Sequence, residues 1–188
     1  MTNPTFAVWI DWDCTDWAAN PHFTTDTTGM RDVTSYVIPP IRISRGSKPD
    51  DWVYPAATLE LKLNNISGVF YPTLATGALF GKIRIWLPIK VVATHLTFPY
   101  PLFYGFICGY AASPLNSNQD IYVYATDGMD VLAKQIVVQD MDDKTVMADG
   151  EAVIEVLDAA GWSAARRTVD LTGGDIIRMP DTFPYEKP

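Results

Sequence analysis

The residues whose types and spacing best suit chemistry are carboxylates near the N-terminus, in the stretch Asp11-Trp12-Asp13-Cys14-Thr15-Asp16. Carboxylates at the first, third and sixth positions of a loop supply the oxygen ligands that Ca²⁺ prefers. The expected glycine is missing, however, and His22 stands where a closing glutamate belongs. We therefore expect Asp11, Asp13 and Asp16 to form a turn closed by side-chain hydrogen bonds, with a metal site as the alternative.

Other residue types that catalyse reactions are scarce in this chain. The two histidines, His22 and His95, have no cysteine or carboxylate at the spacing of a zinc motif. The pair Gly173-Gly174 lacks the strand–loop–helix context of a phosphate-binding loop and is predicted to be a turn. The sequence therefore predicts no catalytic residue, no cofactor site and no metal ligand, and a protein that is not an enzyme.

The charge of the chain excludes one class of partner. The net charge is −8; residues 1–94 carry 8 acidic and 8 basic side chains, whereas residues 95–188 carry 14 and 6. Such a chain repels phosphate backbones, and no Lys/Arg cluster offsets the repulsion, so we expect no specific binding to nucleic acid.

No signal peptide and no apolar run of about 20 residues is present, which predicts folding in a cytoplasm and no membrane span. Cys14 and Cys108 are expected to be two buried free thiols, with a single disulfide as the alternative.

Residues 1–126 are predicted to form an antiparallel β-barrel or sandwich. The segment Thr58–Asn64 alternates strictly, with leucines on one face and polar groups on the other. Residues 82–91 repeat this pattern and predict a strand with Ile85 inward and Lys90 outward. Pro88 lies on the outward face and predicts a bulge or sheet edge there. Five shorter strands are expected at residues 6–11, 33–38, 41–45, 102–110 and 120–125.

Residues 127–174 are predicted to form a small segment of two helices. Asp127 or Thr126 caps the first helix, whose apolar positions recur at helical spacing. These positions are Met129, Leu132, Ala133, Ile136 and Val137. The second helix is expected over residues 147–160, with Gly161 in the left-handed position that follows a helix end. The whole chain is thus expected to be mainly β, in an α+β arrangement.

Residues 175–188 are predicted to form an extended C-terminal arm. Ile176, Ile177 and Met179 favour a short strand, and three following prolines prevent a central position in a sheet. Such a strand needs a partner, either the body of the same chain or another subunit that accepts it by strand addition.

Aromatic side chains are abundant, with six Trp, nine Tyr and eight Phe. They gather at Trp9, Trp12 and Trp17, at Trp52 and Tyr54, and within residues 100–110. Exposed rings of this kind serve as anchors in protein interfaces or stack on sugars, and buried ones belong to the core. The sequence does not separate these three roles.

Eight segments of the chain form an ordered series: residues 8–13 (VWIDWD), 32–37 (DVTSYV), 41–46 (IRISRG), 57–65 (ATLELKLNN), 68–72 (GVFYP), 101–107 (PLFYGFI), 124–132 (YATDGMDVL) and 157–162 (LDAAGW). In the same order, they resemble elements of the minor tail proteins of siphophages and related prophages. The first three resemble that family's WIDWDNDG, DVTS and ISRGR stretches. The ordered series spans roughly 150 residues and is more specific than any one of its fragments.

This resemblance implies a structural virion protein of the tail tip or baseplate, a hub or distal-tail component with a β-barrel. It further implies a homo-oligomeric ring, a trimer or hexamer, that connects the tail tube, the hub and the fibres. The protein would be made in the bacterial host cytoplasm and end in the phage tail. Residues 14–18 depart from the family's longer, glycine-bearing acidic loop, which weakens any inherited metal site. The alternative function is a carbohydrate-binding module for host recognition.

Overall fold

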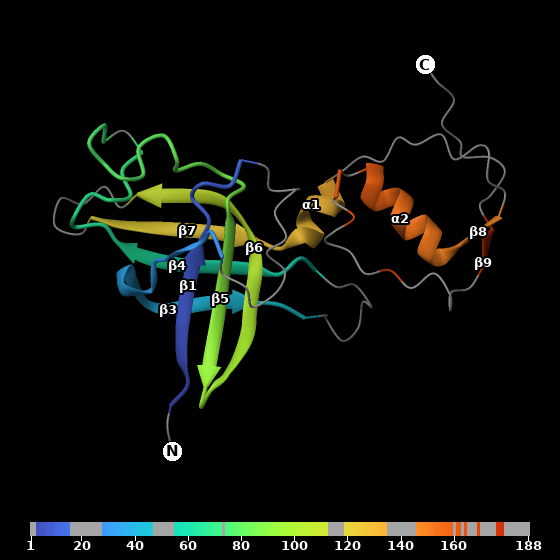
Figure 1. Ribbon diagram of the computed structural model, residues 1–188, viewed down its shortest axis with the longest axis horizontal. Coiled ribbons are helices and arrows are strands. Elements are labelled where there is room, and N and C mark those ends of the chain that lie inside the picture. The colour runs from blue at the N-terminus through green and yellow to red at the C-terminus, as the bar shows by residue number, and fades with distance from the viewer. Residues whose placement is uncertain are drawn as a thin grey trace. The chain divides into compact units, whose positions relative to one another are not determined.

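A computed structural model describes residues 3–15, 28–46, 55–72, 74–112, 119–134, 146–159, 161–162, 164, 169 and 176–178. The chain divides into two compact units, Met1–Ala133 and Lys134–Pro188. The first is called the β unit below and the second the C-terminal unit (Figure 1). Each unit is described by itself.

The β unit is a single antiparallel sheet of seven strands, which confirms the predicted mainly-β class. Its strands are β1 (Thr5–Ile10), β2 (Arg31–Asp32), β3 (Val37–Ser44), β4 (Thr58–Asn64), β5 (Pro88–His95), β6 (Phe98–Ala112) and β7 (Asp120–Thr126). Their order across the sheet is β2-β1-β5-β6-β7-β4-β3, so the sheet is open, with β2 and β3 at its edges.

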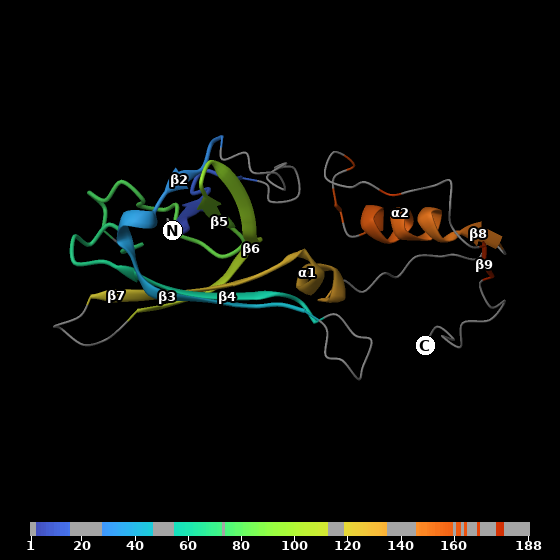
Figure 2. The ribbon, with the colours of Figure 1, turned by 90° about the horizontal axis from the view of Figure 1, so that it is seen from below.

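The sheet folds over on itself along the long strand β6. The first half of β6 pairs with β5 and the second half pairs with β7, with register shifts between Val91 and Val92 and between Ile107 and Gly109. Figures 1 and 2 show the result: β1 and β5 cross over the layer formed by β3, β4 and β7. Bulges of this kind increase the local bend and twist of a strand. The sheet thereby encloses one core between its own two halves.

The core is made of apolar side chains from the inner face of both halves. Its members include Val8, Ile10, Leu59, Leu61, Leu63, Leu87, Ile89, Val91, Phe103, Ile107, Ile121 and Val123. Strand β4 has the bounds and the alternation that the sequence predicts, with Leu59, Leu61 and Leu63 buried. The polar face of the same strand carries Lys62, whose Nζ lies 2.6 Å from Asp120 Oδ2. The hydrogen bond to Asp120 raises the pKa of Lys62.

The strand predicted over residues 82–91 is wrong in its bounds and in the burial of three residues, two of which lie in β5. Strand β5 begins only at Pro88, since residues 74–87 form turns and Trp86 has a positive φ of 68°. Pro88 is buried rather than outward, and it is tolerated because the first residue of a strand need not donate to the ladder. Lys90, predicted outward, is 1% exposed, flanked on its face of the sheet by its cross-strand partners Trp9 and Tyr104. Its Nζ lies 5.7 Å from the centroid of the Tyr104 ring.

The two strands predicted over residues 33–38 and 41–45 are also corrected. Residues Thr34–Tyr36 form a 3₁₀ turn (η1), and β3 then runs without a break from Val37 to Ser44. The turn begins where the Asp32 Oδ1 atom accepts a hydrogen bond from the Thr34 N–H group, at 2.8 Å. An aspartate that bonds the backbone two residues on offers the chain an alternative to a strand.

The first helix, α1 (Gly128–Lys134), begins as predicted. The Asp127 Oδ1 atom accepts a hydrogen bond from the Met129 N–H group at 3.0 Å, and Oδ2 accepts one from Ala57 N–H at 2.8 Å. One carboxylate therefore caps the helix and ties it to the residue before β4. Ile136 and Val137, predicted for the same helix, lie outside the described residues.

The C-terminal unit contains α2 (Asp149–Ala159) and a two-stranded sheet of β8 (Val146–Ala148) and β9 (Ile176–Arg178). The helix begins two residues later than predicted because residues 146–148 pair with β9. Gly161 has the predicted positive φ, of 69°. The Gly161 and Trp162 N–H groups donate to the carbonyls of Asp158 and Leu157, at 2.9 and 2.8 Å, which closes the helix end. The predicted strand at Ile176 and Ile177 thus pairs within its own unit, while Met179 and the prolines after it lie outside the described residues.

Candidate interaction surfaces

The described part of the acidic stretch is the predicted turn. Asp11 is 4% exposed, and its Oδ1 atom accepts a hydrogen bond from the Asp13 N–H group at 3.1 Å. Asp16 and His22 lie outside the described residues. Within the part of the chain that the structure describes, no group of three or more His, Cys, Asp or Glu side chains is placed to hold a metal ion.

Basic side chains from elsewhere in the fold face this turn. The Asp13 carboxylate accepts a hydrogen bond from Lys82 and forms an ion pair with Arg31, whose Nη2 atom lies at 3.7 Å. The hydrogen bond from Lys82 lowers the pKa of Asp13. Arg84 donates to the carbonyl oxygen of Cys14. The turn therefore fastens the connection between β4 and β5 to the end of β1.

Replacing Asp13 with asparagine is expected to make stability less sensitive to acid. The lowered pKa means that the ionised Asp13 stabilises the fold above its unfolded pKa, and that this contribution is lost as the pH falls through the folded pKa. Asp13→Asn should cost about 0.5 kcal/mol at pH 7, as exposed ion pairs do, and nothing at low pH. Urea unfolding of both proteins across the acid range measures this difference. Curves that stay parallel at every pH would contradict the role given to Asp13.

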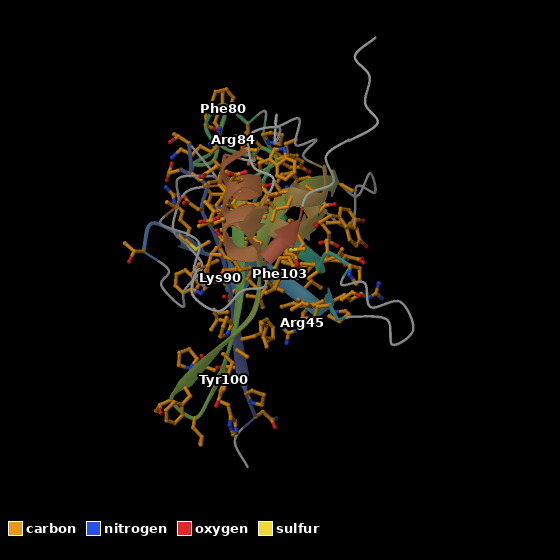
Figure 3. The ribbon with its side chains drawn as sticks, turned by 90° about the vertical axis from the view of Figure 1, so that its right-hand side faces the viewer. Arg45, Phe80, Arg84, Lys90, Tyr100 and Phe103 are labelled. Carbon is orange, nitrogen blue, oxygen red and sulfur yellow. The ribbon has the colours of Figure 1, made fainter. Side chains whose placement is uncertain are left out.

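The first exposed apolar surface is a β arm, made of residues 5–7 of β1 and residues 92–101 of β5 and β6. It carries Phe6, Leu96, Phe98 and Tyr100, which are 41%, 70%, 63% and 51% exposed. Figure 3 shows Tyr100 on the part of these strands that extends away from the body of the unit. Residues 91–119 contain no Asp, Glu, Lys or Arg. Large exposed side chains without neighbouring charges are typical of a surface that binds another protein.

The turn at the tip of this arm holds a leucine in an unfavourable conformation. His95 pairs with Phe98, so Leu96 and Thr97 form a two-residue turn, and Leu96 has a φ of 58°. Glycine, asparagine or aspartate adopts a positive φ at lower cost. Leu96 thus combines a costly backbone conformation with an exposed apolar side chain at the tip of the arm.

The second exposed apolar surface belongs to the connection between β4 and β5, residues 65–87, which the structure describes except for Thr73. This connection buries Phe70 and Leu79 in the core. It also exposes a set of large apolar side chains that we call the loop patch. The set is Ile66, Tyr71, Leu74, Phe80 and Ile85. Ile85 was predicted to point inward, and it is 52% exposed because no strand forms there.

The arm and the loop patch lie at opposite ends of the β unit. Figure 3 places Phe80 and Arg84 at one end and Tyr100 at the other, with Lys90 and Phe103 between them. Figure 1, seen from a direction at right angles, shows the same separation between the connection that follows β4 and the tip of the β5–β6 hairpin.

A shallow groove of about 520 Å³ lies across β3, β4 and β7. Its lining includes Arg42 and Glu60, which form an ion pair at 3.7 Å, and the thiol of Cys108. Cys14 is buried as predicted, but Cys108 is exposed because it lies in the bulge between Ile107 and Gly109. Both thiols are free.

The aromatic residues of the three sequence clusters lie in different environments. Trp12 is in the core, where its ring centroid lies 5.9 Å from that of Phe70. Tyr110 is partly buried, which raises its pKa, and its hydroxyl donates to the Arg84 carbonyl at 3.3 Å. Trp17, Trp52 and Tyr54 lie outside the described residues. The arm was not identified as a surface from the sequence, although the uncharged run from 91 to 119 was a visible signal.

None of the helices among the described residues is long and apolar enough to cross a membrane. Comparison of the sequence with models of known protein families gives no match, and comparison with curated proteins gives none either. The two exposed surfaces and the order of the sequence segments therefore carry the functional argument.

Proposed function

We propose that this protein is a structural component of a phage-type tail, a module near the tail tip that assembles into a ring. In this role it joins the tail tube, the hub and the fibres, and it catalyses no reaction. The observation that carries the proposal is the exposed, uncharged β arm, taken together with the ordered resemblance to minor tail proteins. A trimer or a hexamer is the expected form of the ring.

The composition of the arm favours a protein partner over a sugar. Sugar-binding sites combine aromatic rings with several polar groups that fix the hydroxyls of the ligand. The arm offers Phe98 and Tyr100, but its polar side chains are few within residues 92–101: Thr94, His95 and Thr97. Aromatic and aliphatic side chains without charge are instead the composition of interface centres.

The mass of the purified full chain tests this proposal. Multi-angle light scattering of the chain, alone and mixed with the neighbouring tail proteins, is expected to give discrete trimers or hexamers, or assembly once those proteins are added. The double variant Phe98→Ser/Tyr100→Ser should lose this assembly, because the two rings are expected to be buried in the contact.

A variant at Tyr124 provides the matched control. Tyr124 is an aromatic residue that is 39% exposed on β7, outside both the arm and the loop patch. Tyr124→Ser should assemble like the unmodified chain. A monomer that ignores the neighbouring tail proteins would overturn the proposed function, and a thermal shift on adding glycans would then favour the carbohydrate-binding alternative.

A further inference from the structure

We propose that the arm of one copy docks on the loop patch of the next copy, so that the assembly is built from head-to-tail contacts. This inference rests on the proposed function, because it names the surfaces through which copies of the chain would meet. It assigns Leu96, Phe98 and Tyr100 to one side of the contact, and Phe80 and Ile85 to the other.

The positions of the two surfaces favour this mode of assembly. In a twofold dimer an arm-to-arm contact would leave every loop patch exposed, and a reciprocal arm-to-patch contact would end at two copies and could not form the proposed ring. In a head-to-tail contact each copy uses two different surfaces, and both become covered. The arm and the loop patch are formed by different segments of the chain and lie at opposite ends of the β unit (Figure 3). One type of contact can therefore cover exposed apolar side chains of both surfaces.

The charges near the two surfaces also suit a contact between copies. The chain carries a net charge of −8, so two copies repel each other in most orientations. Residues 61–119, which contain the loop patch and all of the arm except residues 5–7, include no Asp or Glu. The basic residues beside Phe80 and Ile85 already have partners: Lys82 binds Asp13, and Arg84 binds the Cys14 carbonyl. An uncharged arm thus meets a patch without acidic side chains, beside which Lys82 and Arg84 are already hydrogen-bonded within their own copy.

The degree of exposure fits the same contact. Phe98 and Leu96 are 63% and 70% exposed, and Phe80 and Ile85 are each 52% exposed. Aromatic residues, Tyr among them, are enriched among the few buried side chains that supply most of the binding energy of an interface. The strained φ of Leu96 keeps an apolar side chain at the outermost point of the arm, where it would reach a neighbour first.

Mixing two complementary variants of the full chain tests the inference. The arm variant is Phe98→Ser/Tyr100→Ser, which keeps an intact loop patch, and the loop variant is Phe80→Ser/Ile85→Ser, which keeps an intact arm. Each variant alone should self-associate at least about tenfold more weakly than the unmodified chain. A mixture of the two should form a one-to-one heterodimer, because one intact arm and one intact patch remain and no further copy can add. Light scattering and native mass spectrometry measure these species.

The other outcomes separate this inference from the proposed function. A loop variant that still dimerises alone, with no heterodimer in the mixture, would show an arm-to-arm contact and overturn the inference while leaving self-assembly intact. An unmodified chain that stays monomeric at its highest soluble concentration would also overturn it, whereas the proposed function would then stand only if the neighbouring tail proteins bind. Tyr124→Ser is the control, and circular dichroism with thermal unfolding confirms that each variant is folded.

Discussion

Replacing Gly105 with alanine is expected to destabilise the β unit by about 3 kcal/mol or more, a large share of the stability of a domain of this size. A Cβ atom at this position would collide with the backbone carbonyl oxygen of Thr126 and would lie 2.8 Å from two carbons of the Phe103 ring. The carbonyl belongs to the paired strand β7 and cannot rotate away as a flexible side chain would. Gly105 thus permits the close approach of β6 to β7 where the sheet folds over.

A second glycine of the same strand provides the control for this prediction. At Gly109 a Cβ atom would have its nearest neighbour at 3.9 Å, in the Tyr124 ring, which is an ordinary contact. Gly109→Ala should change stability by less than about 1 kcal/mol, and the change can be favourable because alanine restricts the unfolded chain. Chemical unfolding of both variants, followed by circular dichroism, measures the difference. Equal losses at the two positions would contradict the role of Gly105 in the fold.

Replacing Phe70 with alanine is the second change expected to have a large effect, a loss of about 3–5 kcal/mol. Phe70 is 3% exposed, and its ring centroid lies 5.1 Å from that of Tyr36 in an edge-to-face arrangement. Its backbone N–H group donates to the buried Asn65 Oδ1 atom at 2.8 Å. The residue therefore holds the connection between β4 and β5 against the core, and its removal leaves a cavity there.

A variant at Phe80 provides the control, because it makes the same substitution in the same connection at an exposed position. Because Phe80 is 52% exposed, Phe80→Ala should change the stability of the single chain by no more than about 0.5 kcal/mol. Thermal and chemical unfolding at a concentration where the chain is monomeric measures both variants. A small loss for Phe70→Ala would mean that the connection is not part of the core, and that the loop patch is not held in one place.

The losses expected for Gly105→Ala and Phe70→Ala also bear on the proposed assembly, because both residues help to hold the arm and the loop patch in one conformation. A preformed binding surface loses less conformational entropy on contact than one that must first be ordered. Gly105 lies on the strand that also forms the arm, and Phe70 lies in the connection that also forms the loop patch. We therefore expect the fold of the single chain to prepare both surfaces before copies of the chain meet.

Patterns that depend on local geometry were predictable from the sequence alone. The strict alternation of Thr58–Asn64 determined a strand with one buried face, since side chains of a strand point to opposite faces in turn. Asp127 determined the start of α1, because its side chain accepts a hydrogen bond from the first turn of the helix. Gly161 determined the end of α2, because glycine adopts the positive φ that follows a helix end. The turn at Asp11 and Asp13 was predictable for the same reason.

Only the tertiary structure decided which of the alternating residues are buried and which surfaces remain open. Lys90 and Ile85 both follow the period of two, yet the lysine is buried and the isoleucine is exposed. The difference arises because Lys90 lies in a central strand between its cross-strand partners Trp9 and Tyr104, whereas residues 74–87 form turns. The arm, likewise, has the composition of a core segment and is exposed because β1, β5 and β6 extend away from the body of the unit. Burial depends on contacts between residues distant in sequence, and no local pattern records them.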